Sequence, residues 1–538
     1  MSTLDRLRGA ALGAAVLARS GALHPESPAR LFRMMEAARH WGITLGAAFA
    51  TSAARYGART ALVDERGSVT YAELDARTDA VAFGLRDLGV RSGDAVGVLC
   101  RNHRGFFDVT GALAKLGVDT VYLNTGFSAP QLHDVMQRER AHVLVHDEEF
   151  TALACDANIE RRIVAWTEHD ASSSVGTELT IDALARRHAR SGRPLRPDHE
   201  ARTIILTSGT TGTPKGAARE QTSNVGPAVA LLERIPYRAR ETMVVAAPCF
   251  HSWGFGNALV GLLLGDTLVL ERHFDPAATL AAVSRHRAEV LAAVPVMLLR
   301  ILELPIEARD GYDTSSLRLV PLSGSSLPGD LATRFMASFG PVVYNLYGST
   351  EVGYVTIATP DDLLAAPSTA GHAPRGTEIR LLDAHDHEVP EGATGRIFVR
   401  SDLLFEGYTD GGSKLVVDGY MHTGDTGHLD RHGRLFVEGR DDDMIVSGGE
   451  NVFPGEVEDV ISRHPDVLEA AVVGVPDDEF GQRLKAIVVR RPGTALDAGE
   501  LRDYVRGRLA RYKVPRDVEF VESIPRNATG KVLRRHLG

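Results

Sequence analysis

The stretch Thr207 to Gly216, which reads T-S-G-T-T-G-T-P-K-G, constrains this chain more than any other. It follows Thr203 to Leu206, a short β-branched run that predicts a strand ending where the glycines begin. Glycines let successive N–H groups turn towards one anion, and the neighbouring hydroxyls and ammonium add further donors. The stretch therefore predicts a phosphate-binding loop. We assign that role to Thr207, Ser208, Gly209, Thr210, Thr211, Gly212 and Lys215.

This loop is not the nucleotide loop of the common NTPases, because G-x-x-x-x-G-K-[ST] is absent. An ordinary polar turn would explain only one or two of its residues. At this loop the chain resembles the adenylate-forming superfamily of acyl-CoA synthetases, luciferases and the adenylation domains of peptide synthetases. The resemblance extends from about Gly46 to Gly538. It implies that ATP activates a carboxylic acid to an acyl-adenylate, from which a thiol then displaces AMP.

The composition restricts the partners and the compartment. The net charge of -10 is spread along the chain with no long basic run, which argues against nucleic acid as a partner. Cys100, Cys155 and Cys249 are widely separated and show neither a disulfide framework nor the spacing of a zinc site. A reducing, cytoplasmic compartment is therefore expected.

The N-terminal segment 1–20 allows two interpretations. Arg6 and Arg8 precede the apolar stretch Gly9 to Ala18, as in a signal peptide. Apolar residues between Leu4 and Leu17 also fall at helical spacing, and since ATP and CoA are cytosolic we favour an amphipathic helix. We expect this helix to pack on the body of the protein, with peripheral contact to a membrane as the alternative. A homodimer is also compatible with the sequence.

Strands and helices alternate through most of the chain. Ala95 to Leu99 is an apolar strand, Thr70 caps a helix, and Asp275 followed by a proline opens another. The pattern predicts an α/β fold, with a large N-terminal domain of mostly parallel sheets layered with helices and a small mobile α+β C-terminal domain. The expected divisions are a helical extension 1–45, a large domain 46–439 with the ATP and acyl pocket, a hinge 440–443 and a small domain 444–538.

An aromatic segment follows the apolar strand Val244 to Ala247. A lone histidine beside Phe250 is more often packed than catalytic. In the superfamily, however, this position borders the acyl carboxylate, so the resemblance assigns His251, Trp253 and Gly254 to acid binding. Gly254 and Gly256 would leave space beside His251 for an incoming chain. The apolar surroundings favour a medium- or long-chain fatty acid, and aryl and bile-type acids stay open.

The string Y-N-L-Y-G-S-T-E, which ends at Glu351, matches the superfamily's Y-G-[ST]-T-E. Tyr347 offers a flat face to adenine, Thr350 a hydroxyl to the α-phosphate, and Glu351 a hard oxygen ligand to Mg²⁺. A strand followed by a helix cap would produce the same pattern in isolation. The further nucleotide contacts that the resemblance implies are Gly324, Ser325, Gly348 and Ser349. Ser325-Ser326 stands where the superfamily usually has Gly-Gly or Gly-Ala, which leaves the width of the acyl channel open.

Asp425 ends the string D-G-Y-M-H-T-G-D and would accept hydrogen bonds from both ribose hydroxyls. The neighbouring histidines fit no zinc pattern, so we expect solvated side chains at His422, His428 and His432. Arg440 would reach the ribose or the phosphates.

The C-terminal part supplies the remaining functional residues. Asp442 lies in an acidic run suited to an exposed joint and matches the superfamily's hinge. Gly448 and Gly449 permit close approach of a slender ligand, and the corresponding segment of the superfamily lines the pantetheine tunnel for CoA. Lys531 follows an exposed turn and is, by resemblance, the catalytic lysine. A helix is expected from Leu501 to Arg511.

Attack of a carboxylate on the α-phosphate brings two anions together, so positive charge and orientation are needed rather than a base. We expect Mg²⁺ on Glu351, Lys215 at the outer phosphates, and Lys531 with Thr350 at the reacting centre. Rotation about Asp442 would then admit CoA. Two alternatives are a ligase that loads a carrier protein and a non-catalytic lipid or nucleotide sensor. A sensor would normally have lost the residues retained here.

Overall fold

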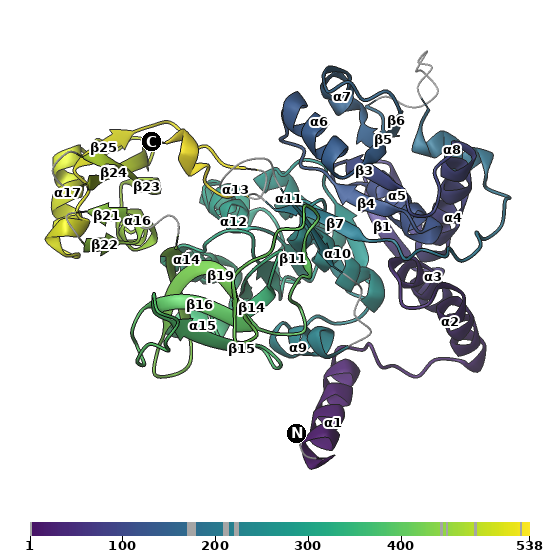
Figure 1. The fold of residues 1–538 in the computed structure, drawn as a ribbon, viewed down its shortest axis with the longest axis horizontal. Helices are drawn as coiled ribbons and strands as arrows, with labels where there is room; N and C mark the ends of the chain where they lie inside the picture. The colour runs from purple at the N-terminus through teal and green to yellow at the C-terminus, as the bar shows by residue number, and fades with distance from the viewer. Residues whose placement is uncertain are drawn as a thin grey trace. The chain divides into compact units, whose positions relative to one another are not determined.

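The computed structural model of the chain describes residues 3–168, 179–207, 215–219, 225–441, 445–447, 450–477, 481–527 and 530–537 (Figure 1). The chain forms two compact units. Unit 1 comprises Met1–Ala293, Arg300–Pro321 and Phe405–Ser413, and unit 2 comprises Val294–Leu299, Leu322–Leu404 and Lys414–Gly538. The boundary expected at 440–443 falls inside unit 2, and the four-part division made from the sequence stays a prediction.

A seven-stranded sheet dominates unit 1, in the order β17-β8-β7-β4-β3-β5-β6. Its strands are β3 (Ala95–Leu99), β4 (Asp119–Tyr122), β5 (Ala141–Asp147), β6 (Arg162–Trp166), β7 (Thr203–Thr207), β8 (Lys215–Arg219) and β17 (Gly407–Tyr408). The strands from β7 to β6 pair in parallel, and β8 and β17 add an antiparallel edge. The helices around it are α4 (Tyr71–Asp87), α5 (Arg104–Leu116), α6 (Ala129–Arg138), α7 (Thr151–Asp156) and α8 (Ile181–Arg187).

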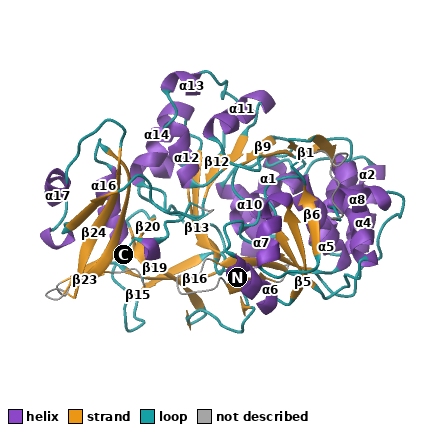
Figure 2. Ribbon diagram, turned by 90° about the horizontal axis from the view of Figure 1, so that it is seen from above, coloured by secondary structure: helices purple, strands orange, loops and turns teal. Residues whose placement is uncertain are grey.

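These helices cover both faces of the sheet, as a parallel sheet requires (Figure 2). Side chains of α6 such as Leu132 and Val135 pack on Val121 and Leu144 of the strands. Helix α4 begins with a capping box in which Thr70 and Glu73 exchange hydrogen bonds, which confirms the predicted cap.

A second sheet of unit 1 has the order β11-β9-β10-β1-β2. Its strands are β1 (Thr60–Asp64), β2 (Gly67–Thr70), β9 (Thr242–Val245), β10 (Thr267–Leu270) and β11 (Val290–Ala292). All neighbours are parallel except β1 and β2. Helices α10 (Ser252–Leu264) and α11 (Pro276–His286) follow β9 and β10, and Asp275 caps α11 through the N–H of Ala278, as the sequence predicts.

The N-terminal residues form helix α1 (Thr3–Arg19), followed by α2 (Pro28–Trp41) and α3 (Leu45–Tyr56). Helix α1 lies against α9 (Gly226–Arg234), where Gly13 approaches Val229, and Val16 is buried. The backbone N–H of Ala239 donates to the carbonyl of Ser20, which fixes the end of the helix. Within the part of the chain that the structure describes, no helix is both long and apolar enough to cross a membrane. Peripheral membrane contact stays a prediction.

Unit 2 begins with the sheet β12-β13-β14, which comprises β12 (Val320–Leu322, its first residues in unit 1), β13 (Val343–Ser349) and β14 (Gly353–Ala358). Next come α14 (Gly329–Phe339), α15 (Pro360–Ala365) and a sheet of β15 (Glu378–Leu382), β16 (Gly395–Arg400), β18 (Val416–Val417), β19 (Tyr420–Leu429) and β20 (Leu435–Arg440). This second sheet is antiparallel in every recorded pairing, which the sequence did not indicate. Tight polar turns such as the one in which Asp430 accepts the N–H groups of His432 and Arg434 allow each strand to return directly.

The C-terminal sheet consists of β21 (Ile445–Ser447), β22 (Glu450–Val452), β23 (Val467–Asp477), β24 (Gly481–Arg490) and β25 (Asp517–Phe520). Helices α16 (Pro454–Ser462) and α17 (Ala498–Arg506) pack on one face, where Val472 and Ala486 are buried. Ala471 and Ile487 point to the other face, which Ile524 and Leu537 of the last segment cover. Helix α17 starts earlier than expected, because Asp497 caps it through the N–H groups of Gly499 and Glu500. Side chains of β23 and β24 alternate between the two faces of the sheet. Those on the second face hold the segment that carries Lys531 in place.

Candidate active site

Several predicted site residues lie outside the described residues. They are Ser208, Gly209, Thr210, Thr211 and Gly212 of the phosphate loop, the hinge residue Asp442, and Gly448 and Gly449. The roles assigned to these residues stay predictions.

The two ends of the phosphate loop are described and lie on neighbouring strands of unit 1. Thr207 ends β7 and Lys215 begins β8, and the two residues pair across the antiparallel ladder. The Lys215 ammonium lies 3.2 Å from an Asp410 carboxylate oxygen and 5.1 Å from the centre of the Tyr408 ring. Asp410 gave no signal in the sequence. Binding of phosphates by Lys215 would therefore compete with this ion pair.

His251 lies directly before α10 in unit 1, with its ring 4.5 Å from that of Phe250. Its Nε2 atom is buried and has no hydrogen-bond partner among the described residues. Burial lowers the pKa of His251 from 6.5 to about 4, so the imidazole is neutral at pH 7. The Nε2 atom of this neutral ring can form a hydrogen bond with a ligand. The ring carries no positive charge with which to attract a carboxylate.

Trp253 and Gly254 begin α10 and are held by backbone on two sides. The Trp253 Nε1–H donates to the carbonyl of Ala293 at 2.9 Å. A Cβ on Gly254 would overlap the carbonyl oxygen of Pro248, so the space beside this glycine is filled by the protein itself. The expectation that Gly254 leaves room for the acyl chain is therefore wrong. At Gly256 no atom lies within 4 Å of a Cβ position, and that space is open.

In unit 2 the structure joins two motifs that are far apart in the sequence. The Tyr347 hydroxyl, on β13, donates to an Asp425 carboxylate oxygen, on β19, at 2.6 Å. The Arg440 guanidinium lies 3.9 Å from the other oxygen, and the N–H of Asp425 donates to Thr423. Both residues lie on strands and not in loops. Tyr347 thus orients Asp425, in addition to any contact that its ring makes with adenine.

Charges around Asp425 oppose the effect of its burial. Burial raises the pKa of Asp425, while the hydrogen bond from Tyr347 and the charges of Arg440, Lys414 and Lys531 lower it. Burial also raises the pKa of Tyr347 well above its ordinary value. Lys531 therefore acts electrostatically on the carboxylate that the sequence assigned to ribose.

A tight turn presents Lys531. Its N–H donates to the side chain of Asn527 at 2.8 Å, and its carbonyl accepts the N–H of Asn527. Gly530 has φ +78°, a conformation that a residue with a Cβ rarely adopts. Arg526 donates to the carbonyl of Gly530 and pairs with Glu469, whose side chain is 3% exposed. Arg526 and Glu469 support the turn, and nothing in the sequence singled them out.

The rest of the Y-G-S-T-E motif forms the turn between β13 and β14. Gly348 has no space for a Cβ, because the carbonyl of Gly353 occupies it. Glu351 is buried, and its N–H donates to the Ser349 hydroxyl at 3.3 Å. Thr350 lies between them. At the end of β12, Gly324 has φ +94° and begins the predicted turn, with Ser325 partly buried behind it.

The histidines near Asp425 are not all solvated, and the structure corrects that expectation. His422 stacks on Phe398 at 4.9 Å with its Nε2 buried, and burial lowers its pKa. His428 bonds to Glu438 at 2.7 Å and stacks on Phe436, whereas His432 is exposed.

Two models of known protein families match this chain. The family model described as AMP-binding enzyme matches residues 49–409, and that of the AMP-binding enzyme C-terminal domain matches residues 456–531. The chain belongs to the AMP-binding enzyme family. The predicted membership in the adenylate-forming superfamily and the α/β fold class are thereby confirmed.

Relatives of this enzyme span most of its length. It is 34% identical to feruloyl-CoA synthase of Amycolatopsis sp over 87% of this chain and 93% of that one. It is 30% identical to the fatty acid–[acyl-carrier-protein] ligase ScoC of Streptomyces coeruleorubidus over 89% and 92%. The structure of o-succinylbenzoate CoA synthetase from Bacillus subtilis with its acyl-adenylate matches at a TM-score of 0.77 and 28% identity, over 91% and 97%. Membership of this family supports ATP-dependent activation of a carboxylic acid by this chain.

Proposed function

We propose that the acid is a cyclic, predominantly aromatic carboxylic acid, in place of the fatty acid that the composition of the pocket suggests, and that CoA is the acceptor. The observation that carries this proposal is the neutral imidazole of His251, whose ring lies against that of Phe250 and whose buried Nε2 atom has no hydrogen-bond partner among the residues that the structure describes. Flat side chains favour a flat ligand, since offset and edge-to-face ring contacts add to simple burial. Two of the three relatives named above are, by name, enzymes of ring-containing acids.

Aromatic rings also pack around the first turn of α10, which follows His251 in the chain. Phe255, one turn into α10, lies 5.2 Å from the ring of Tyr122 and 6.4 Å from that of Phe106. Phe106 and Tyr122 stack at 5.2 Å. Phe106 and Tyr122 are buried and Phe255 packs on both, so the first turn of α10, directly after His251, is held rigidly. A rigid wall selects by shape, which suits a ring better than a flexible chain.

The chemistry follows from charge. The carboxylate oxygen attacks the α-phosphorus of ATP, the bond from that phosphorus to the pyrophosphate oxygen breaks, and pyrophosphate leaves. Lys531 and Lys215 supply positive charge, and the ionised Asp425 holds the ribose. The buried Glu351, with its hard carboxylate oxygens, would hold Mg²⁺, which neutralises phosphate charge when bound. The thiolate of CoA then attacks the acyl carbon, and AMP leaves.

The second half-reaction keeps the domain arrangement expected from the sequence. We propose that residues 444–538 rotate about Asp442 after pyrophosphate leaves and bring Gly448 and Gly449 to the pantetheine arm. The C-terminal sheet has a hydrophobic core of its own, formed by residues such as Val457, Val472 and Leu501, and this supports movement as one body. A cytoplasmic location also stays part of the proposal.

A matched acid panel tests the substrate class. Pyrophosphate release is measured with phenylpropanoate, cinnamate and indoleacetate against octanoate, decanoate and palmitate, each with CoA. We expect kcat/KM to be at least roughly tenfold higher for the ring acids, the effect of one or two pocket contacts. Higher kcat/KM for the straight-chain acids would contradict the proposal.

The relative that loads an acyl carrier protein favours a second candidate function, transfer of the acyl group to a carrier protein. Each acid that gives pyrophosphate is therefore tested with CoA and with a phosphopantetheinylated acyl carrier protein as acceptor. Thioester formation on the carrier protein alone would replace CoA in the proposal. Thioester formation on CoA alone would retire the carrier-protein function.

A further inference from the structure

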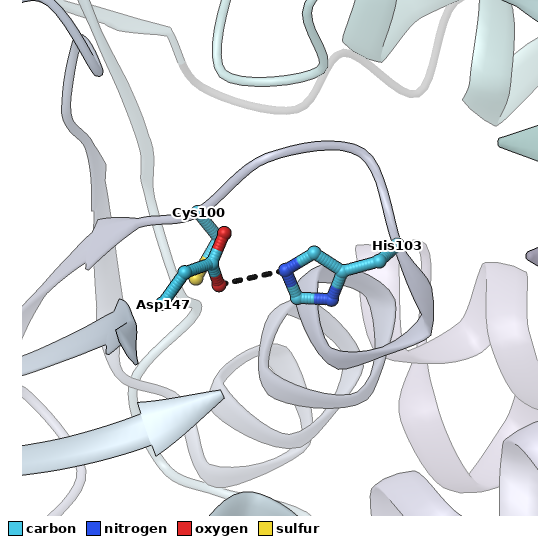
Figure 3. Close-up of side chains that lie close together, drawn as sticks. All are labelled: Cys100, His103 and Asp147. Atoms are coloured by element: carbon cyan, nitrogen blue, oxygen red, sulfur yellow. Dashed lines mark hydrogen bonds and ion pairs between the residues drawn. The ribbon is translucent and has the colours of Figure 1, made fainter. Parts of the chain in front are cut away.

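Three buried side chains of the kind that bind metals come together where the turn between β3 and α5 meets the end of β5. Cys100, His103 and Asp147 are fully buried, and their ligand-type atoms lie within 4.8 Å of one another (Figure 3). The His103 Nδ1 atom accepts the N–H of Gly105 at 3.0 Å, which places the ring proton on Nε2. This proton donates to Asp147 at 2.7 Å. A metal on Nε2 would need the opposite tautomer, so the three side chains form a structural cluster rather than a metal centre.

This cluster fixes the backbone on both sides of Asn102. His103 caps α5, and the second carboxylate oxygen of Asp147 accepts the N–H of Arg101 at 2.8 Å. Asp147 itself ends β5. The residue between Arg101 and His103 therefore has a defined position and direction.

Asn102 holds the backbone that leads to His251. Its side-chain amide N–H groups donate to the carbonyls of Val245 and Ala247, each at 3.0 Å. Its oxygen accepts the N–H of Cys249 at 2.8 Å. Asn102 is 4% exposed, so none of these three backbone groups has water as a substitute. A single side chain in the turn after β3 thus binds the backbone at the end of β9, a strand of the other sheet of unit 1.

The bonded segment, residues 245–251, ends at the candidate acid-binding residue. The N–H groups of Ala246 and Ala247 donate to the carbonyl of Ala292, and the N–H of His251 donates to that of Pro248. Asn102 therefore holds one side of the segment and β11 holds the other. His251 follows two residues after the last contact of Asn102.

We propose that Asn102 is a positioning residue for acid binding, acting through residues 245–251 to set the place of His251. This inference rests on the proposed role of His251 and does not depend on whether the acid is cyclic. Loss of the amide leaves one buried N–H and two buried carbonyls without their partner, and the segment moves to recover hydrogen bonds. A displacement of about 1 Å at a binding group lowers catalytic efficiency roughly a hundredfold.

The test compares two variants of Asn102 with a matched control. Asn102→Ser is too short to reach both carbonyls, and Asn102→Asp keeps the volume but places a carboxylate oxygen against them. Tyr71→Phe removes a different buried hydrogen bond of unit 1, from the Tyr71 hydroxyl to the carbonyl of Asp266 at 2.6 Å. For Asn102→Ser we expect the KM for the acid to rise roughly tenfold or more, with the KM for ATP changed less than about twofold. Tyr71→Phe should change neither.

A second measurement is independent of turnover. Amide hydrogen exchange of residues 246–251, followed by mass spectrometry, should be faster in both Asn102 variants and unchanged in Tyr71→Phe. Unchanged exchange in this segment, or equal rises in the KM values for acid and ATP, would overturn the inference. Faster exchange with no acid accepted by the unmodified enzyme would instead reject the proposed function and leave the contact of Asn102 intact.

Discussion

Replacing Tyr347 by phenylalanine tests the hydrogen bond that connects the two nucleotide motifs of unit 2. The change removes one hydroxyl and keeps the aromatic ring, so any stacking on adenine is preserved. The lost interaction is the 2.6 Å hydrogen bond to Asp425. A hydrogen bond to a charged group contributes about 1.5–3 kcal/mol, and a loss of that size lowers kcat/KM for ATP roughly ten- to hundredfold. The KM for the acid should change little.

The same substitution should also shift the pH dependence of kcat/KM for ATP in a defined direction. Asp425 must be ionised to accept hydrogen bonds from ribose, and burial already raises its pKa. The hydrogen bond from Tyr347 lowers that pKa, so its removal raises the pKa further. The acid limb of kcat/KM for ATP should therefore move to higher pH in Tyr347→Phe. Because the raised pKa means that the folded state binds the proton more tightly than the unfolded chain, this group makes folding more favourable as the pH falls.

The assay is ATP–pyrophosphate exchange at saturating acid, with ATP varied at each pH. Tyr420→Phe is the matched control, since the Tyr420 hydroxyl donates to Glu378 at 2.7 Å in the same unit and no nucleotide role is assigned to either residue. The control should keep the ATP dependence and the acid limb of the unmodified enzyme. An unchanged KM for ATP and an unmoved acid limb in Tyr347→Phe would refute the reasoning.

Three further predictions concern the remaining site residues. Lys531→Ala should lower pyrophosphate release about 10²–10³-fold while supplied acyl-adenylate and CoA still give thioester, and equal loss of both steps would contradict the role of the lysine. Arg526→Met removes the ion pair between Arg526 and the buried Glu469 and should lower the free energy of urea unfolding by at most about 3–5 kcal/mol, with part of the loss recovered by adding Glu469→Gln; equal stability of the single and double variants would argue against the pair. Because burial lowers the pKa of His251 from 6.5 to about 4, the unfolded chain binds that proton more tightly and stability falls as the pH drops through this range. His251→Phe should remove about 3 kcal/mol of that fall, and a pH dependence identical to that of the unmodified enzyme would show that His251 does not titrate in this way.

Local signals in the sequence were sufficient to predict those elements whose conformation is determined by neighbouring residues and not by distant partners. The apolar strand Ala95–Leu99 and the cap at Asp275 were predicted from a few adjacent residues and are present. The strand character of Tyr347 and Asp425 was not predicted, because it depends on pairing with β14 and with β16 and β20. The missing space beside Gly254 has the same origin, since the carbonyl that fills it belongs to a turn whose shape the sequence does not encode locally.

The sequence by itself determined the family and the chemistry, because phosphate binding, carboxylate activation and the terminal lysine each need particular side chains in a short order along the chain. Tertiary structure alone decided which side chains hold those residues in place. Asn102 bonds to a segment beginning at Val245, Arg526 to Glu469, and Tyr347 to Asp425. Such contacts join residues far apart in the chain, and a buried polar group is satisfied by whatever partner the fold brings to it. No local pattern of residues records that partner.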